Sequence, residues 1–548
     1  MLTSGGEELG EVRIRRGIFQ GDTLSPLLFV VAMIPLTLLL RKESMGYAFG
    51  EDKRKINHLL FMDDLKLYGS SEAEVKDLCG VVQKFSDDIG MKFGLSKCAA
   101  LVLKAGVQEK CEGIELPDGE VMHEVEDGGY KYLGVLQGAD IMTKEMKEKV
   151  RKEYLRRVKL VAGAGLSAGN LLRAVNAWAV SVVRYSAGVI TWTHKELKDM
   201  DVKTRKILTT NGVFHRRSNV DRLYMKRKVG GRGLISVEEC VKSEEKGLDE
   251  YVLASDEWML KVVAVAAEVK VSEPRLAYRK RMASERSDRL RTKNLHGKYF
   301  KETENAAPEK SWQWLCDGNT KKWTEGYVCA AQENVLMTRN YRVSVLNQGG
   351  DRMCRLCGQH PETVGHLISA CSKIVQTEYK RRHDKMGLRV YWELCGKYGL
   401  KRSENWWEEV PDAVRLRDDQ KVEIWWDRKV HTDGPKLEHT KPDVVVVDRE
   451  NGKWVIVEFA VPFDKNVVEK EKVKEGTYAE LADRIRREHL VRVECVPIVV
   501  GALGAVTKDL VGWLRKLGVK DVVGCLQMSA IIATTAILRK VLRSDVGK

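Results

Sequence analysis

Long apolar runs and secretion signals are missing from this sequence. The longest largely apolar run, Leu27 to Leu40, has 14 residues and is interrupted by Pro35. Because a membrane-spanning helix needs roughly 20 consecutive apolar residues, we expect no transmembrane segment. The first 30 residues show no signal-peptide pattern, so the 12 cysteines are expected to be reduced thiols of an intracellular protein. No internal repeat or low-complexity linker is present, which excludes repeat architectures.

Positive charge is in excess. The chain has 93 Lys and Arg against 78 Asp and Glu, a formal net charge of +15. This excess favours a polyanionic partner, bound in a salt-dependent way. Charged residues make up 31% of the chain, only modestly above average, so solvated faces are the alternative. Basic clusters occur at residues 13–16, 203–206, 215–217, 226–228, 279–281 and 380–382.

The length of 548 residues suits three or four domains, each with its own core. Residues 141–250 have helical sequence, with apolar residues recurring every three or four positions as in a packed helix. This spacing is clearest at Leu172, Val175, Trp178, Val182 and Tyr185.

Residues 251–345 are also helical and charged but carry no motif that we can interpret. Their tryptophans Trp312, Trp314 and Trp323 are candidates for stacking on nucleic-acid bases. Packing in a core is the more common role of a large aromatic side chain.

One short segment, Ile56 to Gly69, reads INHLLFMDDLKLYG and carries the adjacent acids Asp63 and Asp64. Alternating apolar residues on both sides predict two strands joined by a turn at Met62, Asp63 and Asp64. Neighbouring carboxylates repel each other, and a pair of divalent cations, as in nucleotidyl transfer, would offset the repulsion. A solvated Asp-Asp turn is the alternative. Residues 71–89 then predict a capped amphipathic helix.

Three further motifs flank this segment in order. RGIFQGDTLSP ends at Pro26 before it, and GMKFGLSK (90–97) and YKYLGV (130–135) follow it. This order resembles the palm of a reverse transcriptase, with its QG-x-x-x-SP, [FY]-x-DD, G-L-x-x-x-K and Y-L-G motifs. The resemblance implies that Asp63 and Asp64 bind Mg²⁺ (or Mn²⁺). It also implies a template and nucleotide platform formed by Gln20, Gly21, Ser25 and Pro26.

The third carboxylate that such a polymerase site needs is not found upstream. Residues 1–21 contain no aspartate, and their only acids are Glu7, Glu8 and Glu11 in a polar, Gly-rich lead. There is also no room for the fingers of a polymerase. We therefore expect this chain to be the C-terminal part of a longer polyprotein, and we do not expect it to polymerise alone.

A local cluster of cysteine and histidine predicts a zinc site. The spacing C-x2-C-x8-H-x4-C is formed by Cys354, Cys357, His366 and Cys371. Three thiolates and one imidazole suit a closed, tetrahedral structural Zn²⁺ site. His360 is an alternative ligand, although the spacing to Cys371 favours His366. Because so short a segment has little core of its own, zinc binding is expected to fold it. Nucleic-acid binding and a rigid spacer are both open roles.

A second pair of acids follows, in KPDVVVVDRENGKWVIVEFAVPFDKN from Lys441 to Asn466. Two β-branched runs flank Glu450-Asn451-Gly452, which predicts a hairpin. A turn centred between Glu450 and Asn451 places Asp443 and Glu458 opposite each other. Opposed like charges are destabilising, and a bound divalent cation would reverse that effect. Two edge-of-sheet acids without a metal are the alternative.

These acids resemble the core of PD-(D/E)xK nucleases. The usual lysine two positions after the second acid is replaced by Ala460. In the restriction-like endonucleases of certain non-LTR retrotransposons that lysine lies on the following helix, in a K-x-x-K-Y-x-x-L-A motif. Residues 474–482 match this motif loosely, which implies Lys474 as the electrostatic stabiliser. Lys472 is the alternative, because Gly476 weakens the helix there.

The order of these parts resembles the polyproteins of site-specific non-LTR retrotransposons, of the type that inserts into ribosomal DNA. The resemblance implies a nuclear enzyme that nicks target DNA and copies an RNA template from dNTPs at the nick. A non-catalytic nucleic-acid-binding remnant, and a nuclease with the palm as scaffold, are the alternatives. The expected fold is α+β and multidomain: partial palm (1–140), helical thumb (141–250), helical linker (251–345), CCHC zinc knuckle (346–376) and α/β restriction-like nuclease (377–548).

Overall fold

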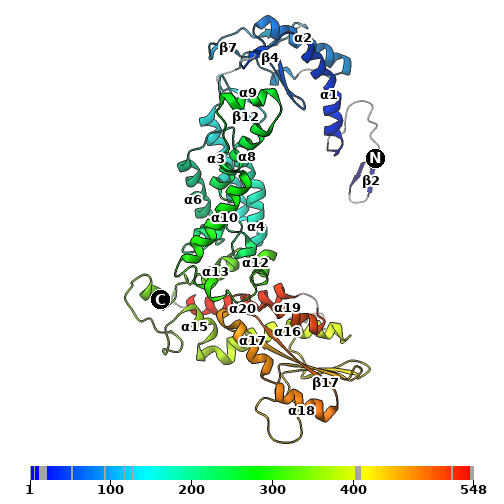
Figure 1. The fold of residues 1–548 in the computed structure, drawn as a ribbon, viewed down its shortest axis with the longest axis vertical. Coiled ribbons are helices and arrows are strands. Elements are labelled where there is room, and N and C mark those ends of the chain that lie inside the picture. The colour runs from blue at the N-terminus through cyan, green and yellow to red at the C-terminus, as the bar shows by residue number, and fades with distance from the viewer. Residues whose placement is uncertain are drawn as a thin grey trace. The chain divides into compact units, whose positions relative to one another are not determined.

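A computed structural model gives the fold and describes residues 2–4, 7–10, 21–50, 53–91, 94–116, 118–125, 128–401, 409–519 and 522–543. The chain contains both helices and strands, as predicted, and divides into two compact units (Figure 1). Unit 1 comprises residues 1–150, 189–191 and 251–270. Unit 2 comprises residues 151–188, 192–250 and 271–548.

The core of unit 1 lies between two helices, α1 (Ser25–Lys42) and α2 (Glu72–Ile89). Leu36 and Leu40 of α1 pack against Leu78 and Val82 of α2, all fully or nearly fully buried. α2 begins and ends as predicted: the Ser71 hydroxyl accepts a hydrogen bond from the Glu74 amide, and the following glycine is left-handed. This two-helix layer supports the strand hairpin that carries Asp63 and Asp64.

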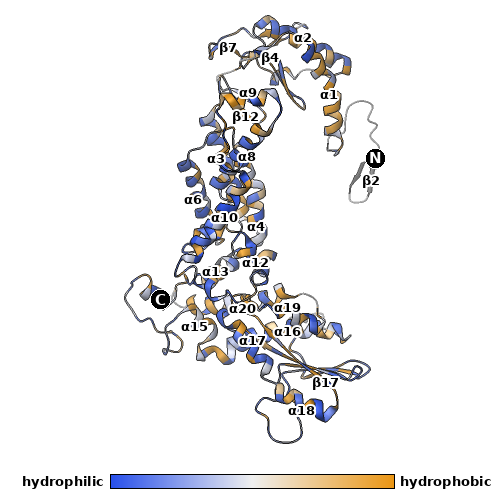
Figure 2. Ribbon diagram, viewed as in Figure 1, coloured by the Kyte–Doolittle hydropathy of each residue, from blue (hydrophilic) through white to orange (hydrophobic). Residues whose placement is uncertain are grey.

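The apolar run from Leu27 to Leu40 lies within the helix α1. This helix is 18 residues long and continues through Pro35. Figure 2 shows that α1 is largely hydrophobic. Many of its apolar side chains are nevertheless exposed, among them Leu27, Val31 and Leu38. Ser25–Lys42 and Val523–Leu542 are long and apolar enough to cross a membrane, on length and composition alone. This is weak support for a membrane span, since core helices of soluble proteins pass the same test.

The strands of unit 1 form small antiparallel pairs rather than one sheet. The hairpin of β5 (His58–Phe61) and β6 (Asp64–Leu67) packs its apolar residues on the α1–α2 layer. A short helix, α9 (Trp258–Ala266), also belongs to this unit. The ring centres of Trp258 and Phe49 are 6.4 Å apart. The remaining pairs are β1 (Leu2–Ser4) with β2 (Glu7–Gly10), β3 (Tyr47–Phe49) with β4 (Arg54–Ile56), β7 (Val102–Lys104) with β8 (Val107–Glu109), β9 (Ile114–Glu115) with β10 (Val121–Met122), and β11 (Tyr130–Tyr132) with β12 (Val135–Gln137).

Helices dominate residues 143–344, as the sequence predicted. The principal ones are α3 (Thr143–Gly163), α4 (Ala168–Ala174), α5 (Val180–Ser186), α6 (His194–Thr210), α7 (Val220–Tyr224), α8 (Val237–Ala254), α10 (Arg275–Thr292), α11 (Lys298–Glu302), α12 (Gln313–Asp317), α13 (Lys322–Gln332) and α14 (Arg339–Ser344). Short 3-10 helices lie at Leu95–Lys97, Arg227–Val229 and Lys310–Trp312.

The apolar stripe predicted from Leu172 to Tyr185 is broken in the structure. Leu172 and Val175 are buried, but Trp178 is 42% exposed and Tyr185 is 65% exposed. The cause is a turn of π-helix at Val175–Ala179, between α4 and α5. A π turn holds one residue more than an α turn, so it rotates the following residues around the helix axis and changes which face is buried.

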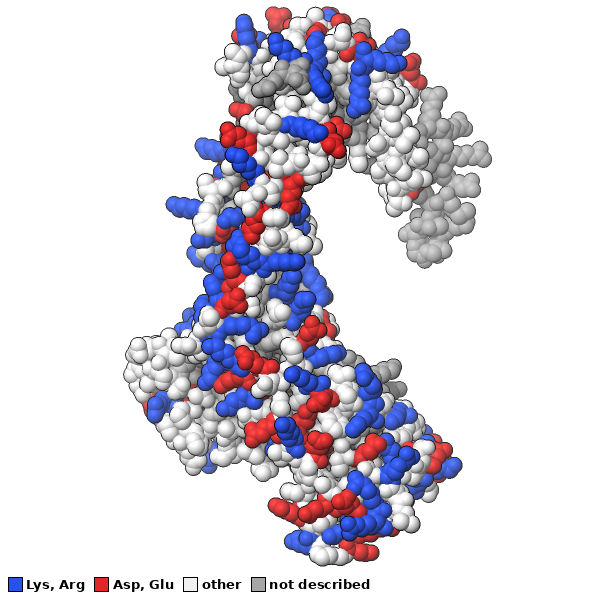
Figure 3. Space-filling view, in the orientation of Figure 1, with Lys and Arg blue, Asp and Glu red and all other residues white. Residues whose placement is uncertain are grey.

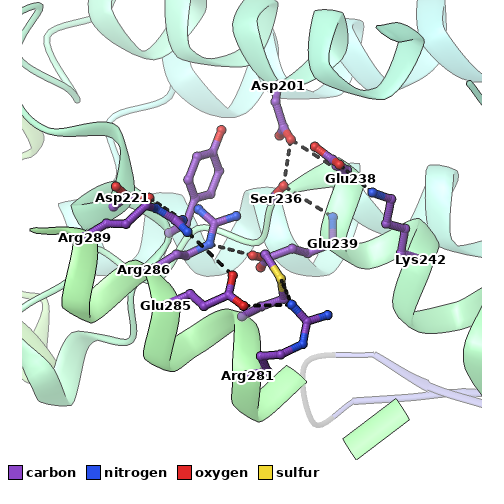
Figure 4. A network of polar contacts seen from close by, with 12 residues as sticks. Asp201, Asp221, Ser236, Glu238, Glu239, Lys242, Arg281, Glu285, Arg286 and Arg289 are labelled. Carbon is purple, nitrogen blue, oxygen red and sulfur yellow. Dashed lines mark hydrogen bonds and ion pairs between the residues drawn. The ribbon is translucent and has the colours of Figure 1, made fainter. Parts of the chain in front are cut away.

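Many of the basic residues in the helices of unit 2 are paired locally. Figure 4 shows Arg286 paired with Glu239, Arg289 with Asp221, and Arg281 with Glu285. In the same network Asp201 caps α8: its carboxylate accepts hydrogen bonds from the Ser236 hydroxyl at 2.7 Å and the Val237 amide at 2.9 Å. Figure 3 likewise shows acidic and basic side chains interspersed over the visible face, so no single large basic patch forms there.

The C-terminal part of unit 2 is built on a five-stranded sheet in the order β13-β14-β15-β16-β17. The strands are β13 (Val414–Leu416), β14 (Val422–Trp426), β15 (Val444–Asp448), β16 (Lys453–Ala460) and β17 (Arg492–Val499). All neighbours are antiparallel except β16 and β17, which are parallel. Helices α17 (Val467–Gly476) and α18 (Ala479–His489) form the crossover that parallel strands require.

Both faces of this sheet are covered, which explains the unbroken valine run of β15. Val444 and Val446 face a core formed with α16 (Lys380–Lys397), α19 (Leu510–Leu517) and α20 (Val523–Arg543). Val445 and Val447 face a second core formed with α18. Since alternate residues of a strand point to opposite faces, a strand buried on both sides needs apolar residues at every position.

Candidate active sites and metal centre

The first pair of acids lies at the tip of the β5–β6 hairpin. Met62 and Asp63 form a two-residue turn, and Asp64 pairs with Phe61 as the first residue of β6. Met62 has φ of 55°, which places it in the left-handed region that such tight turns require. Both carboxylates are exposed to solvent. The predicted turn is therefore present, but it is one residue shorter than Met62-Asp63-Asp64.

The Y-L-G motif lies next to this hairpin. The β11–β12 turn is made by Leu133 and Gly134, both left-handed. Lys66 of β6 donates a hydrogen bond to the Gln137 side chain at 2.9 Å, and its ammonium lies 5.5 Å from the centre of the Tyr132 ring. Burial and then the charge of Asp64 raise the pKa of the Tyr132 hydroxyl. Residues that are 66 and 71 positions apart in sequence are thus brought together.

The platform residues lie at the start of α1. Ser25 and Pro26 are the first two helical residues, where proline is favoured, and Ser25 is buried. Gly21 has φ of 103°, a conformation that other residues rarely adopt. Gln20 lies outside the described residues. Among the residues that the structure describes, no third acid joins Asp63 and Asp64 in a group able to hold a metal.

The predicted zinc ligands converge. The ligand atoms of Cys354, Cys357, His366 and Cys371 all lie within 4.8 Å of one another. The sulfurs of Cys354 and Cys371 are 4.0 Å apart, and Nε2 of His366 lies 3.4 Å from the Cys357 sulfur. Zn–S bonds of about 2.3 Å in a tetrahedron place two sulfurs roughly 3.8 Å apart, so this donor set fits Zn²⁺. His366, rather than His360, is the histidine that joins the three cysteines in this group.

The surrounding fold holds these ligands in place. His366 lies on α15 (Val364–Ser369), whose N-cap Thr363 accepts a hydrogen bond from the His366 amide at 3.1 Å. The Tyr379 hydroxyl accepts from the Cys371 amide at 3.1 Å and donates to the Leu367 carbonyl at 3.0 Å. These contacts hold the backbone in place at His366 and at Cys371.

The segment that contains these four residues is not isolated, whereas the sequence predicted that it has little core of its own. Cys354, Cys371 and Leu367 belong to a buried cluster that also contains Ile531 and Leu538 of α20. Arg355, between the first two ligands, is nearly buried, pairs with Glu362 and donates to the Val541 carbonyl at 3.1 Å. The C-terminal helix and the knuckle therefore share one hydrophobic core.

The second pair of acids faces each other across the β15–β16 hairpin. Val444 pairs with Val457, so the predicted register is correct. The Asp443 amide donates to Oε1 of Glu458 at 3.1 Å, and the Phe459 amide donates to Oδ2 of Asp443 at 2.8 Å. Burial and then the charge of Asp443 raise the pKa of the Glu458 carboxyl. The repulsion expected from the sequence is therefore present.

Lys474 completes this group. It lies on α17, and its ammonium forms an ion pair with Oε2 of Glu458, which is 3% exposed. Lys472 instead lines a different cavity with Glu302 and Glu469. The geometry therefore brings Lys474, and not Lys472, to the two acids. Tyr478, four residues further, is buried beside the site and donates to the Lys441 carbonyl at 2.8 Å.

Sequence reasoning missed one member of this site, His383 of α16. Its Nε2 lies 3.2 Å from Oδ2 of Asp443 and 3.2 Å from the Phe459 carbonyl, while Nδ1 lies 3.1 Å from Asp384. Burial opposes the charged imidazole, but the hydrogen bonds to Asp384 and Asp443 outweigh burial and raise the pKa of His383 to about 10. No sequence motif marks His383, because it precedes Asp443 by 60 residues.

This arrangement suits hydrolysis of a phosphodiester. Two carboxylates on one side of a hairpin offer the oxygen ligands that Mg²⁺ prefers. A lysine beside them can stabilise the negative charge that develops on phosphorus. The histidine holds one carboxylate in a fixed orientation, as partners of metal ligands commonly do.

Comparison with known proteins agrees with the N-terminal motifs. Residues 1–136 match the family of reverse transcriptases (RNA-dependent DNA polymerases). The chain is 23% identical over 437 residues to a retrovirus-related Pol polyprotein from type-1 retrotransposable element R2 of Popillia japonica, a match that covers 75% of this chain and 56% of that protein. The corresponding R2 protein of Nasonia vitripennis is 24% identical over 406 residues, with 69% and 37% covered. That of the type-2 element R2DM of Drosophila melanogaster is 30% identical over 125 residues, with 22% and 12% covered.

The chain thus carries a reverse transcriptase domain. Over much of its length it is similar to the Pol polyproteins of R2 retrotransposable elements, which supports the resemblance drawn from the sequence motifs. The chain spans about half the length of the Popillia japonica relative, and less of the others. The nuclease and the two metals stay predictions at this point.

Proposed function

We propose that this chain is the reverse transcriptase and endonuclease part of a non-LTR retrotransposon polyprotein that acts by target-primed reverse transcription in the nucleus. The observation that carries the proposal is the convergence of Asp443, Glu458 and Lys474. These residues come from a hairpin and a helix of unit 2, in a chain whose residues 1–136 match reverse transcriptases. A family match alone would support only the polymerase.

The nuclease roles follow from the contacts. Asp443 and Glu458 would hold Mg²⁺ (or Mn²⁺), which supplies the activation of a water molecule and of the phosphate oxygens. Lys474 lies beside Glu458 and would stabilise the pentacovalent phosphate. His383 contacts Oδ2 of Asp443 and would hold this carboxylate in a fixed orientation for the metal. Target DNA is the substrate.

The polymerase roles fall to unit 1. Asp63 and Asp64 would hold Mg²⁺ at the exposed tip of their hairpin, where phosphates of a dNTP can reach them. Gln20, Gly21, Ser25 and Pro26 would shape the platform for the RNA template and the nucleotide. Polymerisation additionally requires a third carboxylate, and the described residues supply none at this hairpin.

The zinc ion has a structural role in this proposal. Cys354, Cys357, His366 and Cys371 use all four positions of a tetrahedron, which leaves no open position for substrate. The knuckle shares its core with α20 and so connects the end of the helical region to the nuclease sheet. Binding of a nucleic-acid strand at the knuckle is compatible with this role.

A nicking assay tests the nuclease. Supercoiled plasmid is incubated with the full chain and Mg²⁺, beside Asp443→Asn, Lys474→Ala and Lys472→Ala variants. Because Lys472 lies two residues away on the same helix but contacts neither acid, it is the matched control. We expect nicking by the parent and by the Lys472→Ala variant and loss of nicking in the other two. A parent that leaves the plasmid intact would contradict the proposal.

One observation favours a second candidate function, a nucleic-acid-binding protein without nuclease activity. In the structure each acid is already paired with a cation, Asp443 with His383 and Glu458 with Lys474. Such pairs can hold a domain together without any chemistry. Plasmid binding without Mg²⁺-dependent nicking is the result expected for this second candidate.

A further inference from the structure

A groove in unit 2 combines aromatic and basic side chains and belongs to neither proposed active site. Its volume is about 660 Å³, within the range of ligand pockets in proteins. One wall is the helix α13 with Trp323 and Tyr327, and a second is the end of α20 with Arg539. The third is the loop after α6, with His215 and Arg216.

The three tryptophans that are candidates for stacking on bases differ in their exposure to solvent. Trp312 is 6% exposed and Trp314 is not exposed at all, and both belong to the core shared with the knuckle. Trp323 is 46% exposed at the mouth of the groove. Tyr327 follows one helical turn later, so the two rings lie on the same face of α13.

Cationic groups lie beside these rings. The Arg539 guanidinium is 5.3 Å from the centre of the Tyr327 ring, and it donates a hydrogen bond to the Trp323 carbonyl at 3.4 Å. Arg216 is exposed, and none of the described carboxylates forms an ion pair with it. Burial, together with Arg217 and Arg216, lowers the pKa of His215 to about 4, so this ring is neutral. Among the described residues that line the groove, none is acidic.

We propose that this groove binds a single-stranded nucleic acid, with a base stacked on Trp323 and the adjacent phosphates held by Arg216 and Arg539. Exposed aromatic rings next to arginines, in a groove without acids, are the features that bind single strands without sequence preference. A duplex keeps its bases stacked on each other, so it can use the arginines but not the ring. The inference rests on the proposed function, because it assigns a surface to the nucleic acid that such an enzyme handles.

Affinity measurements with the full chain test the groove. Fluorescence anisotropy gives the affinity for a labelled single-stranded RNA, a single-stranded DNA of the same sequence, and the matching duplex. We expect Trp323→Ala to weaken binding of the single strands by about 5-fold to 100-fold, and of the duplex much less. Trp323→Phe keeps a ring and should retain most of the affinity. Comparing the RNA and DNA arms shows which strand the groove prefers.

Trp178→Ala is the matched control. Trp178 is also exposed, at 42%, and lies 4.9 Å from an arginine, Arg157, but it does not line the groove. Its replacement should leave the affinity unchanged. Arg216→Ser should reduce the slope of log K against log salt by about 0.7, the value for one phosphate of a single strand.

Photocross-linking locates the bound strand. An oligonucleotide carrying 5-iodouracil should cross-link to the peptide that contains Trp323 and Tyr327. If Trp323→Ala binds single strands with unchanged affinity and the cross-links form elsewhere, the groove is not the binding site. The proposed function would not be affected by that result. A parent chain that binds no single strand would also contradict the proposed binding site. Plasmid nicking tests the nuclease separately.

Discussion

Asp443 and Glu458 lie opposite each other across the β15–β16 hairpin, and the amide of the first donates to the carboxylate of the second at 3.1 Å. Two acids are thus held together in a largely buried place by backbone hydrogen bonds. Only Lys474 and His383 offset their charges within the described residues. A divalent cation would lower the free energy of this site further, and that expectation leads to the first two predictions.

Replacing Lys474 by alanine should reduce the rate of Mg²⁺-dependent nicking by about 10²-fold to 10³-fold, the usual cost of losing one group that stabilises charge in a transition state. Lys472→Ala should nick as the parent does, because Lys472 lines a different cavity. Initial rates on supercoiled plasmid give the comparison. Equal loss in both variants would show that the helix α17, rather than the ammonium at Glu458, is what matters.

His383→Ala should lower nicking by about 10-fold to 100-fold, the effect typical of residues that orient metal ligands. Because His383 acts through Asp443, the variant should also need more Mg²⁺ for half-maximal rate. His383→Gln, which can still donate to Oδ2 of Asp443, should recover part of the loss. A reduced rate with an unchanged Mg²⁺ requirement would argue for a purely structural role.

Cys371→Ser should remove the bound zinc, from about one ion per chain to none, because a closed structural site needs all four ligands. Cys371 is fully buried in the core that contains Ile531 and Leu538, so thermal stability of unit 2 should fall as well. The control is Cys525→Ser, an exposed cysteine outside the cluster. Zinc content by mass spectrometry and unfolding by circular dichroism are the measurements. Retention of zinc by the Cys371→Ser chain would contradict the ligand set.

Asp464 should make stability depend on pH. Its carboxylate is buried, and it accepts hydrogen bonds from the Tyr299 hydroxyl at 2.9 Å and from the amides of Leu503 and Ala505 at 2.9 and 2.8 Å. Burial outweighs these bonds and raises its pKa from 3.8 to about 6. Between those values the folded state binds a proton that the unfolded state does not. Stability should therefore rise by up to roughly 3 kcal/mol as pH falls through 6 toward 4.

Asp464→Asn isolates this contribution, since asparagine does not titrate. The free energy of unfolding of the parent minus that of Asp464→Asn should increase as pH falls from 7 to 5, because only the parent gains stability from protonation of Asp464. A gap that stays constant with pH would mean that Asp464 titrates at its ordinary value.

Local patterns predicted the elements on which the candidate sites lie. The turn residues Glu450-Asn451-Gly452 set the register of the second hairpin, and that register places Asp443 opposite Glu458. The CCHC spacing likewise selected the four residues that converge. These predictions succeeded because hairpin register and knuckle geometry depend on residues close together in sequence.

Other predictions failed where distant contacts decide. The helical stripe from Leu172 to Tyr185 was split by a π turn. The helix α1 has a largely apolar sequence, yet many of its apolar side chains are exposed. Periodicity measures where apolar residues lie along a helix, but it does not tell which partners cover them.

The sequence by itself determined the resemblance to reverse transcriptases, the Cys and His residues that converge and the two pairs of acids, because each is carried by a short motif with a definite spacing. Only the tertiary structure decided that His383 joins Asp443, that Lys474 rather than Lys472 reaches Glu458, and that Trp323 alone of three tryptophans is exposed. These outcomes depend on how α16, α17 and α13 pack against elements far away in sequence. Packing of that kind is set by the whole core and leaves no local pattern to read.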